Sequence, residues 1–394
     1  MPKTSILIPD GESTLTKHVI HCLAYHPDIE IHVLSKDPKS VIQHSRFIKS
    51  FRTYNEKKIT ARAAVLTGNA VIDDLLLYHH YDPEKKLEIM DEIIACAKSA
   101  GATIIFPVDE HIVKIIGYER SLLDANGLRI LTPDIKMFLT AIDKWELSQF
   151  LKGTDIPHPP TVRWNQGTSS TVANNLKFPV IIKPINQGNA LGIRSFRDQE
   201  SFLDFFEKEK IEHEYIVQPL ISGYDIDCSV LCSNGKVLAY TIQKAVQHAA
   251  VEYRAAVGIE FLNNDEVIGT VTRMMEKLNW SGVAHIDLRY DADAKEVKVI
   301  EINARYWGSL LGSLNAGVNF PYLAIETLNG KTFSMPSYTF KKYFMSNAPF
   351  KKILSTMFKS KDSKVALRDT SLFYSLRDLK PFIAETYSKI MSRL

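Results

Sequence analysis

The segments SGVAHIDLRYD (281–291) and VKVIEINARYWGSL (297–310) decide the fold of this chain. Each has the residue pattern of a β-strand, and residues 292–295 between them form a predicted tight turn, so we expect an antiparallel pair. Side chains alternate between the two faces of a strand, and folding the pair about its turn brings Asp287 close to Glu301. The pair therefore places two carboxylates on one face of a sheet.

Two further polar side chains belong to the same face. Asn303 and Arg305 follow Glu301 at intervals of two residues, so the three side chains point the same way. Crowded carboxylates repel one another unless a cation lies among them, and a set of Asp, Glu and Asn oxygens suits Mg²⁺ shared with substrate phosphates. The planar guanidinium of Arg305 suits a phosphate or an acyl phosphate.

The composition is that of a multidomain globular chain. With 394 residues, of which 45% are apolar and 24% charged, two to three domains are expected. No run of 18 apolar residues occurs and the start, MPKTSILIPDGES, lacks the regions of a signal peptide, so we expect a cytoplasmic location. The four cysteines form no zinc pattern and are expected to be reduced thiols.

Charge is distributed unevenly along the chain. Residues 331–394 hold 13 Lys or Arg and 4 Asp or Glu, a net charge of +9, which leaves −6 on the first 330 residues of a chain whose total is +3. A packed basic helical extension is the favoured interpretation. The alternative is a surface that binds a membrane or a polyanion through residues 339–364, where aromatic and aliphatic residues alternate with lysines.

Alternating strand and helix patterns in the first third predict a parallel α/β domain. Strands are expected at 4–9, 29–35 and 102–108, helices at 13–25, 84–100 and 109–126, and a closing segment at 128–133. The turn after the first strand is IPDGES and not G-x-G-x-x-G, so a nicotinamide-cofactor site is disfavoured.

The central third supplies a second candidate site. FPVIIKP (178–184) is a predicted strand with Lys183 in an apolar run, where a charge is costly unless it meets an anion. The following QGNALGIR (187–194) has two glycines that allow backbone amides to approach a ligand, as phosphate loops require. Combined with the carboxylates of the hairpin, these features predict a nucleoside-triphosphate site.

The remaining patterns complete the outline of this region. They predict a helix ending at Gly153, a Pro-rich extended segment to 162, a helix near 198–209, a strand at 214–220, a strand–turn–strand unit at 222–244, a loop at 245–264 and a helix capped by Asn264 or Asp265.

This ordered set of residues resembles the ATP-grasp superfamily over roughly residues 1–330. The resemblance assigns the two ATP-contacting lysines to Lys144 and Lys183, the lid over the phosphates to Gly188–Gly192, the adenine hinge to Gln218, Pro219, Leu220 and Ile221, and the ribose contact to Asp225. It assigns the Mg²⁺ ligands to Asp287, Glu301 and Asn303. Two ions are implied, and Mn²⁺ can substitute for them.

Within that superfamily, EINARYWGSL (301–310) is similar to stand-alone carbamoyl-phosphate-synthetase-like proteins of the carboxylate–amine ligase type, with Ala304 where many relatives have proline. The resemblance gives Lys183 and Arg305 catalytic roles. D-alanine ligases have an arginine at the position of His285, which here is either an oxyanion contact or a structural histidine.

Two residues of the predicted 245–264 loop are candidate substrate contacts. In the ATP-grasp fold this region faces the acceptor pocket, so Arg254 could bind a carboxylate and Glu260 an amine. A solvated loop is the alternative.

The resemblance implies an α/β protein, α+β in its catalytic part, with a parallel pre-ATP-grasp domain, the two lobes of an ATP-grasp domain and a basic extension. The expected divisions are 1–133, 134–216, 217–330 and 331–394. The implied activity is an ATP- and Mg²⁺-dependent ligase that activates a small-molecule carboxylate as an acyl phosphate for attack by an amine. A non-catalytic ATP-binding protein and a peripheral membrane or polyanion-binding protein are the alternatives. A homodimer is expected, and a nucleic-acid partner is not.

Overall fold

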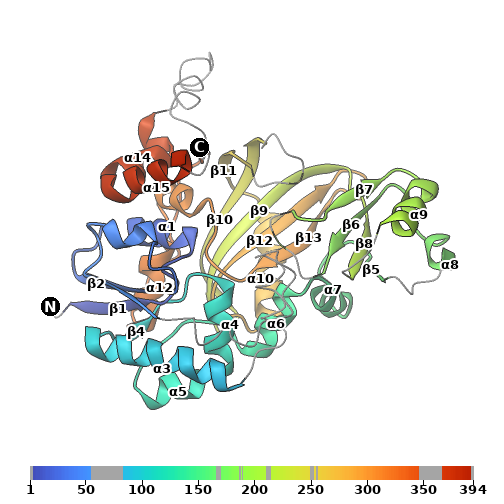
Figure 1. Cartoon of the computed structure of the whole chain (residues 1–394). Helices are drawn as coiled ribbons and strands as arrows, with labels where there is room; N and C mark the ends of the chain where they lie inside the picture. The colour runs from blue at the N-terminus through green and yellow to red at the C-terminus, as the bar shows by residue number, and fades with distance from the viewer. Residues whose placement is uncertain are drawn as a thin grey trace.

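Strands of the described part of the chain form three sheets, with helices packed around and between them (Figure 1). The computed structural model describes residues 3–54, 83–165, 170–185, 188, 190–209, 214–248, 253, 256–345 and 366–391. The mixed α/β architecture agrees with the prediction from the sequence. No helix in these ranges is long and apolar enough to cross a membrane.

The N-terminal sheet is parallel, as the alternating pattern predicted. Its strand order is β3-β2-β1-β4, with β1 (Thr4–Ile8), β2 (Ile29–Ser35), β3 (Ser50–Thr53) and β4 (Ile104–Ile105). Its helices are α1 (Thr14–Leu23), α3 (Pro83–Ala100), α4 (Glu110–Tyr118) and α5 (Arg120–Ala125). The predicted single helix at 109–126 is wrong, because Glu119 leaves helical geometry (φ −113°, ψ 26°) between α4 and α5.

The predicted strand at 102–108 is also shorter than expected. It pairs with β1 only at Ile104 and Ile105. The amide of Phe106 still donates to the carbonyl of Leu7, but Pro107 has no N–H to continue the ladder. The chain therefore leaves the sheet here and enters α4 through Asp109, whose side chain caps the helix.

A small antiparallel sheet follows, in the order β5-β8-β6-β7. Its strands are β5 (Val162–Trp164), β6 (Val180–Pro184), β7 (Arg194–Phe196) and β8 (Tyr215–Pro219), and its helices are α8 (Ser170–Ala173) and α9 (Gln199–Lys208). Phe202 of α9 is fully buried and contacts Trp164, Phe178 and Phe196 edge to face. The expected division between residues 216 and 217 falls inside β8.

The large sheet has the order β13-β12-β9-β10-β11-β14. Its strands are β9 (Gly223–Ser233), β10 (Lys236–Gln247), β11 (Gly258–Leu262), β12 (Gly282–Asp291), β13 (Glu296–Asn303) and β14 (Lys342–Phe344). The predicted hairpin is confirmed, with Asp287 opposite Glu301. The predicted loop at 245–264 is wrong in part, because Ile259 and Phe261 alternate into the core and form β11.

The two faces of the large sheet pack on different partners. One face, with buried Ile226, Ile286 and Leu288, packs against a cluster that includes residues of α6 (Ile135–Ile142), α7 (Lys144–Lys152) and α10 (Asp265–Lys277). The other face, with Leu231 and Phe261, shares a core with β1, β2, α1, α11 (Leu310–Ala316) and α12 (Phe320–Leu328). This second core fixes the N-terminal sheet against the large sheet.

The C-terminal region is not purely helical. Besides η4 (Leu367–Asp369), α14 (Ser371–Arg377) and α15 (Leu379–Met391), it contributes β14, which pairs with β11. Tyr343 of β14 and Tyr374 of α14 are buried in the same core as β1. Part of this region thus packs on the body, while other apolar side chains of α15 stay exposed. Most of the segment 339–364 lies outside the described residues.

Gly223 at the start of β9 provides a test of the register between β9 and β12. Its φ is +141°, and an added Cβ would overlap the backbone carbonyl of Tyr290. We expect Gly223→Ala to lower the free energy of unfolding by at least about 2 kcal/mol, because the substitution adds both steric overlap and backbone strain. Chemical denaturation would measure the change. Gly153→Ala is the control, since Gly153 has φ −82° and its nearest neighbour would be 3.5 Å away. Equal stabilities of the two variants would contradict the register.

Candidate functional site

One face of the large sheet carries two neighbouring rows of polar side chains across four strands. The first row is Gln243, Asp227, Asp287 and Glu301, and the second is Thr241, Ser229, His285 and Asn303. A register shift after Asp287 marks a β-bulge in the ladder between β12 and β13. A bulge changes the direction in which nearby side chains point. This one lies beside the carboxylates that were predicted from the sequence to bind a metal ion.

The three predicted metal ligands lie together in these rows. The amide Nδ2 of Asn303 donates to Oδ1 of Asp287 at 3.3 Å, and Glu301 lies directly opposite Asp287. Withdrawal from water and the nearby carboxylates of Asp227 and Glu301 raise the pKa of Asp287 well above its usual value. The set therefore offers oxygen donors and excess negative charge, which fits a hard divalent cation.

Two lysines approach the carboxylates from separate elements. Lys144 is the first residue of α7, whose N-terminus is capped by Asp143, and its Nζ lies 3.5 Å from Oε1 of Glu301. Lys183 is buried on β6 of the small sheet. Withdrawal from water lowers the pKa of Lys183 to about 8, while the charge of Glu301 acts in the opposite direction. Both predicted lysines are thus brought to the carboxylate rows.

Arg305 connects the rows to the N-terminal sheet. Its Nη2 donates to Oδ1 of Asn303 at 3.2 Å, and its Nη1 donates to the carbonyl of Tyr306 at 2.8 Å. Its Nε lies 3.5 Å from Glu110 and 3.8 Å from Asp109. Withdrawal from water raises the pKa of Glu110 to about 6, although the charge of Arg305 opposes that shift.

Sequence reasoning missed the two acids that contact Arg305. Asp109 and Glu110 follow the buried residues of β4, at the carboxyl end of a parallel sheet. Ligand sites of open α/β sheets lie at such ends, and that rule would have pointed to them. Their approach to Arg305 depends on how the N-terminal sheet packs against the large sheet.

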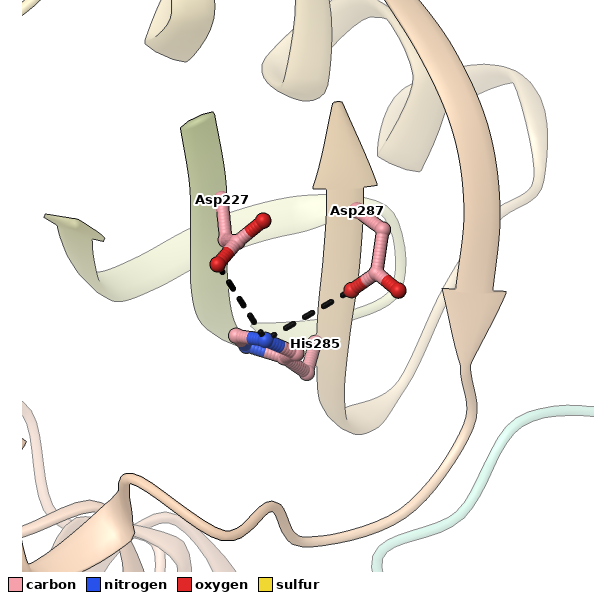
Figure 2. Close-up of side chains that lie close together, drawn as sticks. All are labelled: Asp227, His285 and Asp287. Atoms are coloured by element: carbon pink, nitrogen blue, oxygen red, sulfur yellow. Dashed lines mark ion pairs between the residues drawn. The ribbon is translucent and has the colours of Figure 1, made fainter. Parts of the chain in front are cut away.

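His285 lies between two carboxylates, as Figure 2 shows. Its Nε2 is 3.5 Å from Asp287 and 4.0 Å from Asp227, and its Nδ1 shares a hydrogen bond of 2.9 Å with the hydroxyl of Ser229. The ring stacks on Trp307, with centroids 5.6 Å apart. Burial lowers the pKa of His285 to about 3, so the imidazole is neutral near pH 7.

Asp227 is a further member of the rows that sequence reasoning did not select. Its Oδ2 accepts a hydrogen bond of 3.1 Å from Gln243, whose own Oε1 accepts one of 2.8 Å from Ser309. Withdrawal from water raises the pKa of Asp227. The signal was present in the sequence, because Asp227 follows the predicted ribose contact Asp225 by two residues and so shares its face.

The predicted nucleotide contacts lie at the junction of the small and large sheets. The side chain of Gln218 is buried and donates to Thr161 at 2.9 Å, and the amide of Leu220 donates to Pro179 at 2.9 Å. The carbonyl of Ile221 accepts from Arg289 at 2.9 Å. Arg289 also forms an ion pair with Asp225.

These hinge groups are therefore partly engaged within the protein. The amide of Leu220 is held by Pro179, whereas the roles of Gln218, Ile221 and Asp225 toward a nucleotide stay predictions.

The structure describes only some of the residues predicted for the lid and for the acceptor pocket. Gly188 and Gly192 lie between β6 and β7, both exposed and Gly192 with φ +70°, but residues 186, 187 and 189 are outside the described ranges. Arg254 is also outside them. Glu260 lies opposite Lys244 on β10, and therefore on the other face of the sheet from Gln243 and Asp227. The structure does not bring Glu260 to the carboxylate rows.

Comparison with known proteins identifies the domain that carries this site. Residues 141–309 match the family model described as an ATP-grasp domain. A D-alanine--D-alanine ligase of Polaromonas sp. (strain JS666 / ATCC BAA-500) is 23% identical over 235 residues, which cover 54% of this chain and 70% of that ligase. The mitochondrial arginine-specific carbamoyl phosphate synthase large chain of Schizosaccharomyces pombe is 24% identical over 226 residues, which cover 52% of this chain and only 19% of that protein.

A solved structure supports the same fold. The biotin carboxylase domain of Hydrogenobacter thermophilus 2-oxoglutarate carboxylase, in complex with MgADP, ADP and bicarbonate, superposes with a TM-score of 0.63. It is 14% identical and covers 86% of this chain and 73% of its own. Residues 141–309 thus match an ATP-grasp domain, and the solved structure shows that the fold is shared. The predicted resemblance, including that to carbamoyl-phosphate-synthetase-like ligases, is confirmed.

The depressed pKa of Lys183 predicts a pH dependence of nucleotide affinity. Lys183 is charged below about pH 8 and neutral above it, so raising the pH removes a positive charge that phosphates require. We expect the dissociation constant for ATP, measured in EDTA, to rise about tenfold between about pH 7 and about pH 9. Calorimetric titration would measure it. Lys183→Arg keeps its charge over this range and should lose the pH dependence. An identical profile in both proteins would refute the role of Lys183.

Proposed function

We propose that this protein is an ATP- and Mg²⁺-dependent ligase that joins a small-molecule carboxylate to an amine. One observation carries the proposal: Lys144, Lys183 and Arg305 come from three separate elements and converge on the carboxylate rows. The ATP-grasp match and the D-alanine ligase and carbamoyl phosphate synthase relatives support the same class of chemistry.

The donor set fits Mg²⁺ on chemical grounds. Asp287, Glu301 and Asn303 present oxygen atoms. Withdrawal from water, and then the charges of Asp227 and Glu301, raise the pKa of Asp287, and a cation would favour its ionised form. When bound there, Mg²⁺ would supply positive charge to phosphate oxygens during phosphoryl transfer. Two ions and replacement by Mn²⁺ are parts of the proposal that remain predictions.

The positions of the cationic side chains indicate different roles for them in the reaction. Lys144 and Lys183 lie on the α7 and small-sheet side of the rows, where they would neutralise the phosphates of ATP. Arg305 lies on the N-terminal side, between Asn303 and Glu110, where its planar group would hold the substrate carboxylate and then the acyl phosphate.

The proposed reaction has two steps. A carboxylate oxygen of the substrate takes the γ-phosphoryl group of ATP, and the bond to ADP breaks. The amine nitrogen then attacks the acyl carbon, phosphate leaves with the electron pair of the C–O bond, and the nitrogen loses a proton. No side-chain nucleophile is required, so the site needs only to position reactants and stabilise charge.

The neutral His285 distinguishes this site from that of a D-alanine ligase. The resemblance assigns an arginine to this position in those enzymes. Since burial keeps His285 uncharged, it would not hold a carboxylate as an arginine does. We therefore propose a ligase whose substrates differ from two D-alanines. A homodimer, a cytoplasmic location and the four divisions of the chain remain predictions.

Removal of Glu301 should abolish ATP turnover without unfolding the protein. Glu301 is partly exposed and interacts with Lys144 rather than with the apolar core, so Glu301→Ala should leave the melting temperature within a few degrees. ADP formation would be measured with pools of amino acids and small carboxylates. Glu296→Ala is the matched control, because Glu296 is a carboxylate at the other end of β13. Retained ADP formation in folded Glu301→Ala would refute the metal assignment.

Removal of Arg305 should separate chemistry from nucleotide binding. Arg305→Met should reduce kcat at least about 100-fold, because it removes a charged donor from the reacting carboxylate. The affinity for ATP should change little, since the two lysines remain. Steady-state kinetics and equilibrium dialysis would measure the two quantities. Arg273→Met, which alters a surface ion pair with Asp155, is the control. A loss of ATP affinity equal to the loss of kcat would place Arg305 on the nucleotide instead.

A further inference from the structure

Three side chains of types that bind metal ions meet on the large sheet, as Figure 2 shows. Asp227, His285 and Asp287 each offer one ligand atom, and these atoms all lie within 4.8 Å of one another. We refer to these residues as the histidine set. Bonds from nitrogen or oxygen to a transition-metal ion are about 2.0–2.2 Å long, so ligand atoms around one ion lie roughly 3–4 Å apart. Small side-chain rotations would therefore bring the histidine set onto a common ion.

The imidazole of His285 is oriented in the way that a metal-bound histidine is. Its Nδ1 shares the hydrogen bond of 2.9 Å with Ser229, and its ring stacks on Trp307. With the proton on Nδ1, the lone pair of Nε2 faces the two carboxylates, at 3.5 Å from Asp287 and 4.0 Å from Asp227. These separations are too long for good hydrogen bonds. Three atoms that carry lone pairs thus face one another, an arrangement that a cation between them would stabilise.

The two carboxylates of the histidine set are held from outside by uncharged groups. Gln243 donates to Asp227 at 3.1 Å and accepts from Ser309 at 2.8 Å. Asn303 donates to Asp287 at 3.3 Å. Within the described ranges, neither carboxylate forms an ion pair with a lysine or an arginine. Outer hydrogen bonds of this kind orient metal ligands without neutralising them.

The position of Asp287 separates the histidine set from the proposed Mg²⁺ ligands. In the first polar row, Asp287 lies between Asp227 on β9 and Glu301 on β13. Asp227 and His285 would hold an ion on one side of Asp287, and Glu301 and Asn303 would hold Mg²⁺ on the other. The ions of two-metal sites lie about 3.5–4 Å apart, a distance that one carboxylate can bridge.

We infer that Asp227, His285 and Asp287 bind a divalent ion of the first transition row, which Mg²⁺ replaces poorly. The reason is the imidazole nitrogen. Mg²⁺ takes oxygen ligands, whereas ions from Mn²⁺ to Zn²⁺ accept imidazole together with carboxylates. The proposed Mg²⁺ ligands contain no nitrogen donor of this kind, so the two sets differ in the ions that they select.

An ion on the histidine set would supply positive charge close to Arg305. His285 lies opposite Asn303, which accepts a hydrogen bond from Arg305 at 3.2 Å. The resemblance assigns an arginine to the position of His285 in D-alanine ligases, and an imidazole does not by itself replace that charge. A metal ion would replace it and would hold an oxygen of the substrate carboxylate. This role rests on the proposed function, whereas the binding of the ion does not.

The test is electron paramagnetic resonance of Mn²⁺ bound to the full-length, nucleotide-free protein in excess Mg²⁺. Mg²⁺ should compete for the all-oxygen ligands and leave Mn²⁺ on the histidine set. We expect the spin echo of bound Mn²⁺ to show modulation from a directly bonded nitrogen. The loss of the free Mn²⁺ signal on titration gives the dissociation constant.

Two substitutions test the ligands one at a time. His285→Phe keeps a ring that can stack on Trp307 but removes the nitrogen, so the nitrogen modulation should disappear and the dissociation constant for Mn²⁺ should rise at least about tenfold. Asp227→Asn should raise it by a similar factor. Asp225→Asn is the matched control, because it removes the same charge from the same face of β9, at a carboxylate that is paired with Arg289.

Several results would overturn the inference. In the wild-type protein these are the absence of Mn²⁺ binding in excess Mg²⁺, or bound Mn²⁺ without nitrogen modulation. In the variants they are nitrogen modulation that persists in His285→Phe, or equal losses of affinity from Asp227→Asn and Asp225→Asn. Unchanged melting temperatures would show that the variants fold, and the wild-type measurement decides without them. ADP formation is tested separately with Glu301→Ala, so failure of either proposal can be told from failure of the other.

Discussion

The site depends on one constraint. The sheet holds several carboxylates in register, where their negative charges repel one another. Asp227, Asp287 and Glu301 occupy one row across three neighbouring strands, where backbone hydrogen bonds prevent them from moving apart. Withdrawal from water, and then the charges of Asp227 and Glu301, raise the pKa of Asp287. Positive charge nearby stabilises the ionised row; Lys144 and Arg305 partly provide it, and a metal ion would complete it.

The apolar packing of the sheet explains why this strained row persists. Ile226, Ile286 and Leu288 alternate with the polar residues and bury their side chains on the reverse face, so sliding a strand by one residue would expose them. On the polar face, His285 stacks on Trp307, which lies in the core shared with the N-terminal sheet. The hydrophobic energy of both cores therefore holds the carboxylates in place.

Local sequence patterns predicted most strands and their faces correctly. They failed for strands whose pairing partner lies far away along the chain. The hairpin at 281–303 and the helix capped by Asn264 were correct because their signals lie within a few residues. The strand β11 was missed because its pairing with β10 spans the sparse 245–257 segment. The strand β14 was missed because a short basic segment becomes a strand only beside β11.

The sequence by itself determined that Asp287, Glu301 and Asn303 share a surface, because the two-residue period of a strand is a local property. It also indicated Lys183 and Arg305 from their places on predicted strands, whereas Lys144 was indicated only through resemblance to a family. Tertiary structure alone decided that Asp227 lies beside Asp287, because β9 pairs with β12 across more than 50 residues of chain. It likewise decided that Glu110 reaches Arg305 and that α15 keeps its apolar face exposed. Such contacts depend on the packing of distant elements, which no short-range pattern encodes.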